Sequence, residues 1–89
     1  MDKRIQISEE AVNEIKNRMS LFLEETRSLL SNLERTIDNA EVMGWRDFRY
    51  RDFKERFESL SKPIKDSIRE MEEDMLPELN ILISSINEF

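Results

Sequence analysis

A single glycine near the midpoint of the chain, Gly44, separates two long stretches whose apolar residues recur every three or four positions. Glycine adopts the left-handed conformation that ends a helix more readily than other residues do. Asp47 follows three residues later, and its side chain can cap the first turn of a new helix. The pattern predicts two helices joined by a short turn at residues 44–46, which folds them antiparallel.

The first helix is predicted from about residue 8 to about residue 43, with Ser8 as its cap and a start near Asp2 as the alternative. Its apolar residues form two neighbouring rows rather than one narrow seam. The first row is Val12, Ile15, Met19, Phe22, Leu29 and Leu33, and the second is Leu23, Leu30 and Ile37. This width indicates a helix that packs against more than one neighbour.

The second helix is predicted from residue 47 to about residue 87, and it contains Pro63 and Pro77. A proline in a helix interior removes a donor and collides with the carbonyl four residues earlier, which costs about 3 kcal/mol. The apolar stripe nevertheless keeps its phase across both prolines. We therefore expect one continuous helix bent near one or both of them, with separate shorter helices as the alternative.

A short turn centred on residues 44–46 makes the numbers of facing residues sum to about 89. The expected neighbours are Leu29 with Leu60, Leu33 with Phe57, Phe22 with Ile68, and Met19 with Met71. A lone hairpin still leaves part of each apolar stripe in water, and a large exposed apolar surface usually marks an interface.

The predicted fold class is therefore all-α: a single domain over residues 1–89, built as an antiparallel two-helix hairpin that dimerises into a four-helix bundle. A monomer with a loosely covered core is the alternative. The residues expected to form the core and dimer interface are Phe22, Leu29, Phe57, Leu60 and Ile68.

The composition argues against catalysis. The chain has no Cys and no His, which removes thiolate metal sites, disulfides and the commonest general base. Carboxylate pairs at helical spacing, such as Glu10 with Glu14, lie off the apolar stripe and lack the His partners of metal-binding bundles. We expect no enzyme, no catalytic residue, no cofactor and no metal site.

Charge and hydropathy restrict partners and location. The net charge is −6, whereas nucleic-acid binding needs a basic surface. The basic cluster after the turn, from Arg46 to Arg56, is interleaved with acids and indicates a solvated helix face. A docking surface for an acidic partner is the alternative. No apolar run approaches the ~20 residues of a membrane span, and the start lacks a signal-peptide core. We expect synthesis in the cytoplasm and, if the protein is secreted, export without a cleavable signal peptide.

Five aromatic residues lie within 13 positions at the turn: Trp45, Phe48, Tyr50, Phe53 and Phe57. They either cap the end of the bundle or, chiefly through Trp45, present an anchor to another protein. Trp45-Arg46-Asp47, followed by Phe53 and Phe57, resembles the central Trp-x-Gly turn of the WXG-motif family. These are the early secreted antigenic target-like small helical hairpins of bacterial type VII secretion. Asp47 replaces the family's glycine, and the family's Tyr-x-x-x-Asp/Glu export signal after the second helix is absent.

The resemblance implies a non-enzymatic interaction protein of a type VII secretion pathway, either a secreted effector or a partner or chaperone of a secreted protein. It would pair with itself as a homodimer, or with a related helical hairpin or toxin segment. Gly44, Trp45, Asp47 and Phe53 would form the recognition motif at the turn. The alternative is a cytosolic adaptor or immunity-type protein whose acidic C-terminal half masks a basic partner.

Overall fold

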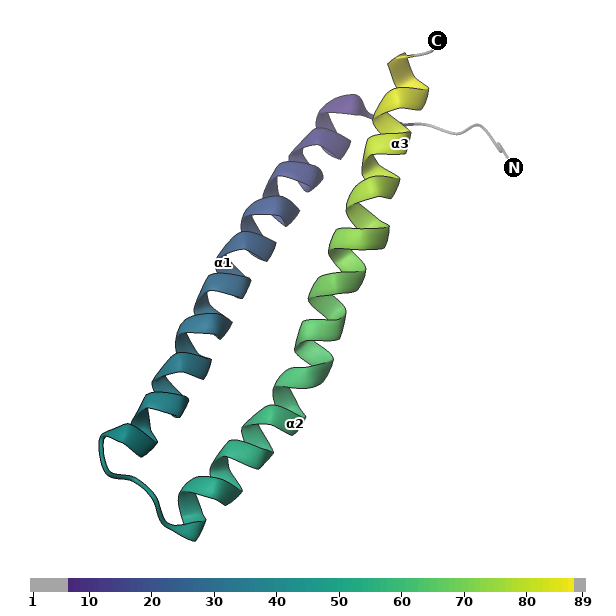
Figure 1. Ribbon diagram of the computed structural model, residues 1–89. Helices are drawn as coiled ribbons and strands as arrows, with labels where there is room; N and C mark the ends of the chain where they lie inside the picture. The colour runs from purple at the N-terminus through teal and green to yellow at the C-terminus, as the bar shows by residue number, and fades with distance from the viewer. Residues whose placement is uncertain (1–6, 88–89) are drawn as a thin grey trace.

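The computed structural model describes residues 7–87, which form a helical hairpin (Figure 1). Helix α1 (Glu9–Val42) is one rod. The other consists of α2 (Phe48–Glu70), the π-helix η1 (Met71–Met75) and α3 (Leu76–Asn87) without interruption. No strand occurs within the described range. The predicted all-helical hairpin is confirmed.

The start of α1 lies where Ser8 predicts it. The Ser8 hydroxyl accepts a hydrogen bond from the backbone N–H of Ala11 at 3.2 Å. Glu9 and Glu10 occupy the first turn, where negative charge interacts favourably with the helix dipole. The alternative start near Asp2 falls outside the described residues.

The two prolines are accommodated differently. Pro63 lies inside α2, which remains helical on both sides of it. Pro77 is the second residue of α3, and the backbone N–H of Leu76, directly after η1, bonds to the carbonyl of Met71, five residues back. In a regular α-helix the ring of Pro77 would collide with the carbonyl of Glu73, four residues earlier. Glu73 lies within η1, where the wider π-helical turn changes this spacing. The second rod therefore stays helical from Phe48 to Asn87.

The register between the rods differs from the expectation. Residue numbers of the ion-paired partners Arg27 and Glu72 sum to 99, as do those of Glu34 and Lys65. The expected sum of about 89 is therefore too small at these two pairs. The numbers of Asp38 and Lys54 sum to 92, and Met19 and Met71, whose numbers sum to 90, line one depression, so the sum is not constant along the hairpin. The reason lies in the connection: residues 43–47 extend beyond the end of α1 before α2 begins (Figure 1), so the second rod is displaced toward the turn.

The residues that fill the seam also differ from the expectation. Leu29 and Leu60, expected to face each other, are 70% and 69% exposed, so neither lies in the seam between the rods. Phe22, expected beside Ile68, is also exposed, whereas Ile68 is buried and Phe57 is half-buried. The buried residues of the seam are Val12, Leu23, Ile37, Tyr50, Ser61 and Ile68. The second rod thus covers the Leu23–Ile37 row of α1 and leaves most of the first row open.

Candidate protein-interaction surface

One flank of the seam carries a continuous set of exposed apolar side chains, which we call the apolar face. It consists of Ile15, Phe22, Leu29 and Leu33 on α1 and Phe53, Leu60, Ile64, Met71 and Met75 on the second rod. Apart from Met71, which is half-buried, these side chains are 44–70% exposed. Spacings of four and seven residues keep each row on one side of its helix.

A shallow depression shows that both rows belong to the same side of the hairpin. Ile15, Met19 and Phe22 of α1 line it together with Met71 of η1, and its volume is about 470 Å³. We call it the methionine hollow. Met19 and Met71, which were expected to lie near each other, both border it.

The opposite flank of the seam is charged. Arg27, Glu34 and Asp38 of α1 pair across the seam with Glu72, Lys65 and Lys54, respectively. The Lys65–Glu34 and Lys54–Asp38 pairs span 2.6 and 3.1 Å. The hydrogen bond to Asp38 raises the pKa of Lys54. Exposed pairs of this kind contribute little stability, but their charged groups are well solvated, so this flank gains nothing from being covered. The hairpin is therefore two-sided.

The turn begins with the end of α1. Gly44 has a φ of +117°, and it is the residue that the sequence assigns to the helix stop. The N–H of Trp45 bonds to the carbonyl of Ala40 at 3.0 Å, and the N–H of Gly44 bonds to that of Glu41 at 3.1 Å. This pair of bonds is the Schellman arrangement, which satisfies carbonyls that would otherwise lack partners.

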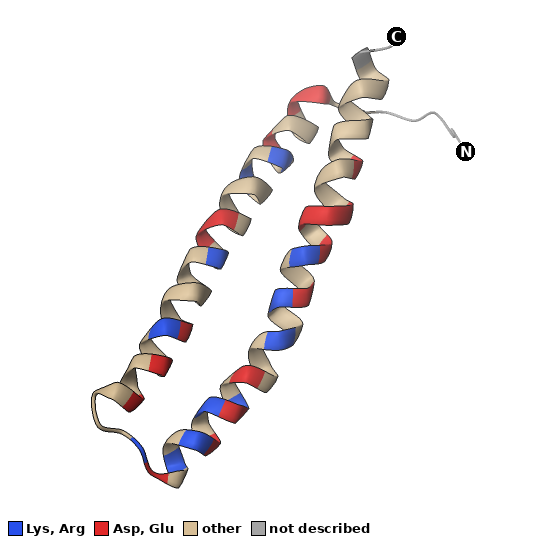
Figure 2. Ribbon diagram, viewed as in Figure 1, with Lys and Arg blue, Asp and Glu red and all other residues tan. Residues whose placement is uncertain are grey.

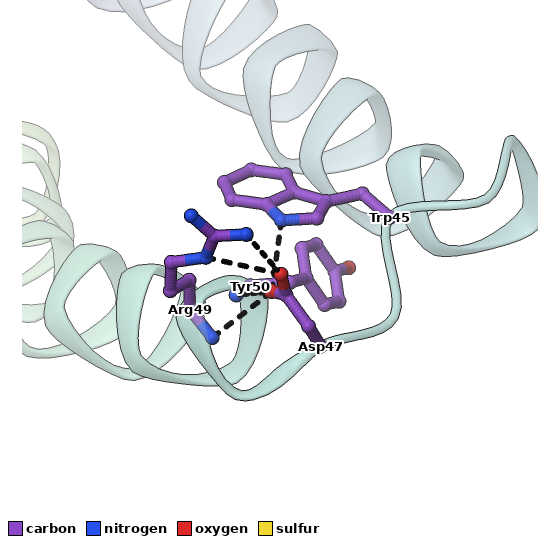
Figure 3. A network of polar contacts seen from close by, with 4 residues as sticks. All are labelled: Trp45, Asp47, Arg49 and Tyr50. Carbon is purple, nitrogen blue, oxygen red and sulfur yellow. Dashed lines mark hydrogen bonds and ion pairs between the residues drawn. The ribbon is translucent and has the colours of Figure 1, made fainter.

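Asp47 organises the rest of the turn (Figure 3). Its Oδ1 accepts hydrogen bonds from the backbone N–H groups of Arg49 and Tyr50, at 3.0 and 3.1 Å, and from Nε1 of Trp45 at 3.0 Å. Its Oδ2 accepts from Nη2 and Nε of Arg49 at 2.9 and 3.1 Å. The Arg49 hydrogen bonds, followed by that from the Tyr50 backbone, hold the pKa of Asp47 below its ordinary value. Asp47 is thus the N-cap that the sequence predicts, and it also fixes Trp45.

The indole of Trp45 lies over other aromatic rings. Its centroid is 5.2 Å from that of Tyr50 and 5.9 Å from that of Phe53, within the usual range for paired rings. Trp45 remains 41% exposed. The turn therefore brings together Trp45, Asp47 and Phe53 of the predicted recognition motif, next to Gly44.

Sequence reasoning missed several features of this end. Val42, Met43 and Phe48 are 72–81% exposed, more than any residue of the apolar face. Val42 and Met43 received no role in the sequence-based prediction. Tyr50 was named as one of the five aromatic residues at the turn, without a partner for its hydroxyl, although a buried tyrosine usually has one.

The described part of the chain contains no group of three or more acidic side chains placed to hold a metal ion. None of its helices has the length and apolar character needed to cross a membrane. The chain matches no protein-family model, no curated protein and no solved structure.

Proposed function

We propose that this chain is a non-enzymatic interaction protein that acts by helical-bundle dimerisation. The apolar face of one hairpin packs on the same face of a second copy and completes a four-helix bundle. The observation that carries the proposal is the two-sidedness of the hairpin: exposed apolar rows flank the seam on one side, and cross-helix ion pairs flank it on the other.

The amount of exposed surface supports this pairing. A folded monomer of 10.7 kDa exposes about 5500 Å² on average, whereas this chain exposes 7602 Å². A standard interface buries about 800 Å² on each partner. A hairpin of two rods leaves more surface in water than a compact fold does, and the apolar face is the side where burial gains most.

The charge distribution favours a second copy in the antiparallel orientation. The turn half of the hairpin (residues 25–65) carries nine basic and eight acidic residues. The described open half (residues 7–24 and 66–87) carries three basic and ten acidic residues. In Figure 2 the basic residues lie mainly on α2 and α1, and α3 has none. In a parallel pair, with both turns at the same end, the acidic open halves of the two copies would lie side by side and repel each other. In an antiparallel pair, the acidic open half of each copy lies beside the nearly neutral turn half of the other.

The pairing is tested by measuring mass with light scattering. We expect a mass of twice 10.7 kDa for the wild type and a monomer for Leu29→Asp or Leu60→Asp, because a charge buried in an apolar interface is costly. Leu21→Asp is the control, since Leu21 is also an exposed leucine (52%) but lies outside the apolar face. A wild-type protein that stays monomeric at all concentrations contradicts the proposal.

We further propose that this pairing serves a type VII secretion pathway, as effector or as partner of a secreted protein. The support is the WXG-like turn, in which Trp45 lies between two long helices. Export into the medium, compared with and without the ATPase of the secretion system, is the test. Export that requires the ATPase supports the role. Retention in the cell in both strains, including when the neighbouring gene's product is present, favours the cytosolic adaptor instead.

A further inference from the structure

We propose that Leu60 of each copy packs into the methionine hollow of the other copy. This contact rests on the antiparallel pairing proposed above and specifies its register. Leu60 is one of the two most exposed residues of the apolar face, and the hollow is a depression that side chains of this face from both rods line together. A protruding leucine and a methionine-lined depression on the same surface form a self-complementary pair.

The two features lie at matching heights from opposite ends of the hairpin. Leu60 is 12 residues after the start of α2 at Phe48, or about 18 Å from the turn end at 1.5 Å per residue. Phe22 is 13 residues after the start of α1 at Glu9, or about 20 Å from the open end. When two hairpins pair antiparallel with their ends level, Leu60 of one copy therefore comes level with the hollow of the other.

The lining of the hollow suits this occupant. Met19 and Met71 have unbranched, adaptable side chains that mould around an incoming apolar group. Ile15 and Phe22 supply the rest of the apolar wall, and Glu14 and Arg18 stand at the rim. An aliphatic side chain displaces water from this depression without leaving a buried polar group unpaired.

The observed register makes the contact testable, because Leu60 and Phe22 cannot touch within one chain. The ion pairs on either side of Leu60, Lys54–Asp38 and Lys65–Glu34, have sums of 92 and 99 and place Leu60 level with residues 32–39 of α1. Phe22 is at least 10 residues away, or about 15 Å along the helix. Substitutions this far apart have additive effects unless a second molecule connects them.

The experiment is a double-mutant cycle on the full chain, with the dimer dissociation constant measured by sedimentation equilibrium. We expect Leu60→Ala and Phe22→Ala each to raise the dissociation constant about tenfold. If the two residues contact each other, the effects are not independent. The fold increase in the dissociation constant of the double variant should then be smaller than the product of the two single increases, by a factor of about three or more. Alanine at exposed helical positions preserves helicity, and circular dichroism verifies this for each variant.

Two controls separate the possible failures. Leu21→Ala should leave the dissociation constant unchanged. For Leu29→Ala combined with Phe22→Ala, the fold increase in the dissociation constant should equal the product of the single increases, since both residues lie on α1 and do not share a contact in the proposed register. Multiplicative effects for Leu60 with Phe22, in a protein that is still dimeric, overturn the Leu60 contact and leave the dimer in place. A monomeric wild type overturns the proposed function itself.

Cross-linking provides an independent readout, because the chain has no cysteine of its own. The Leu60→Cys and Met19→Cys proteins are given tags of different length, so that mixed and self-linked disulfide dimers differ in size. The two proteins are then mixed and oxidised. A predominantly mixed disulfide supports the contact. Predominant Leu60→Cys self-linkage means that two turn halves lie together and overturns both the contact and the antiparallel orientation.

Discussion

The hydroxyl of Tyr50 donates a hydrogen bond to the backbone carbonyl of Ile37 across 2.7 Å, and both residues are buried. The bond connects the first turn of α2 to the C-terminal part of α1. At this end the rods need a large side chain to bridge them, and Tyr50, which is 2% exposed, fills that space. The aromatic residues of the turn thus have a structural role that precedes any role in recognition.

Tyr50→Phe removes this hydrogen bond and keeps the ring. We expect the free energy of unfolding to fall by about 1 kcal/mol, the usual net contribution of an internal hydrogen bond. Tyr50→Ala should cost about 3–5 kcal/mol, because it also leaves a cavity. Urea unfolding at one fixed protein concentration measures both, since dimerisation makes apparent stability depend on concentration. Equal losses for the two variants would mean that the ring itself contributes nothing.

Gly44→Ala tests the helix stop. A Cβ at Gly44 would meet no atom within 4 Å, so the substitution causes no clash, and its cost comes from the positive φ alone. We expect a loss of about 1–2 kcal/mol in unfolding free energy. Gly44→Asn should lose less, because asparagine tolerates left-handed conformations better. An alanine variant as stable as the wild type would show that the turn rearranges easily.

Sequence patterns predicted the local features of this hairpin well, because caps and helix stops depend on few residues. Ser8 and Asp47 cap the first turns of their helices with side-chain oxygens, and Gly44 adopts the positive φ that ends α1. The spacing of apolar residues likewise predicted two long helices and a stripe wider than one seam. These features need no knowledge of how the rods are arranged in space.

The relative placement of the rods was beyond such reasoning. The register depends on how far residues 43–47 extend past the end of α1, and no residue in the turn specifies that distance by itself. Leu29 and Leu60 lie on the surface because each rod packs through a neighbouring row of residues, which includes Leu23 and Ile37 on α1 and Ser61 and Ile68 on α2. The choice between the two apolar rows of α1 is likewise decided by packing. Pro77 indicated a disturbance, but not that η1 would absorb it.

Asp47 should make stability depend on pH. Its folded-state pKa is lowered, chiefly by Arg49, so the ionised carboxylate stabilises the folded state above the ordinary aspartate pKa of about 4. This stabilisation is lost as the pH falls through the lower folded-state value. Asp47→Asn keeps a capping side chain and removes the titration. We expect the difference in thermal midpoint between the wild type and Asp47→Asn to narrow as the pH falls below about 4. A constant difference across that range would exclude this role for Asp47.

Trp45 combines contacts inside the turn with exposed surface, and its substitution separates the two roles. Trp45→Ala removes the packing on Tyr50 and Phe53 and the hydrogen bond to Asp47. It leaves the Schellman bonds and the backbone caps of Asp47, which involve no indole atom. We therefore expect far-UV circular dichroism to show helicity close to that of the wild type, while the dimer or partner complex weakens. Trp45→Phe keeps a ring but loses the indole N–H, so its complex should be weaker than that of the wild type and stronger than that of Trp45→Ala. If most of the helical signal disappears in Trp45→Ala, the tryptophan holds the hairpin together, and its exposed part is incidental.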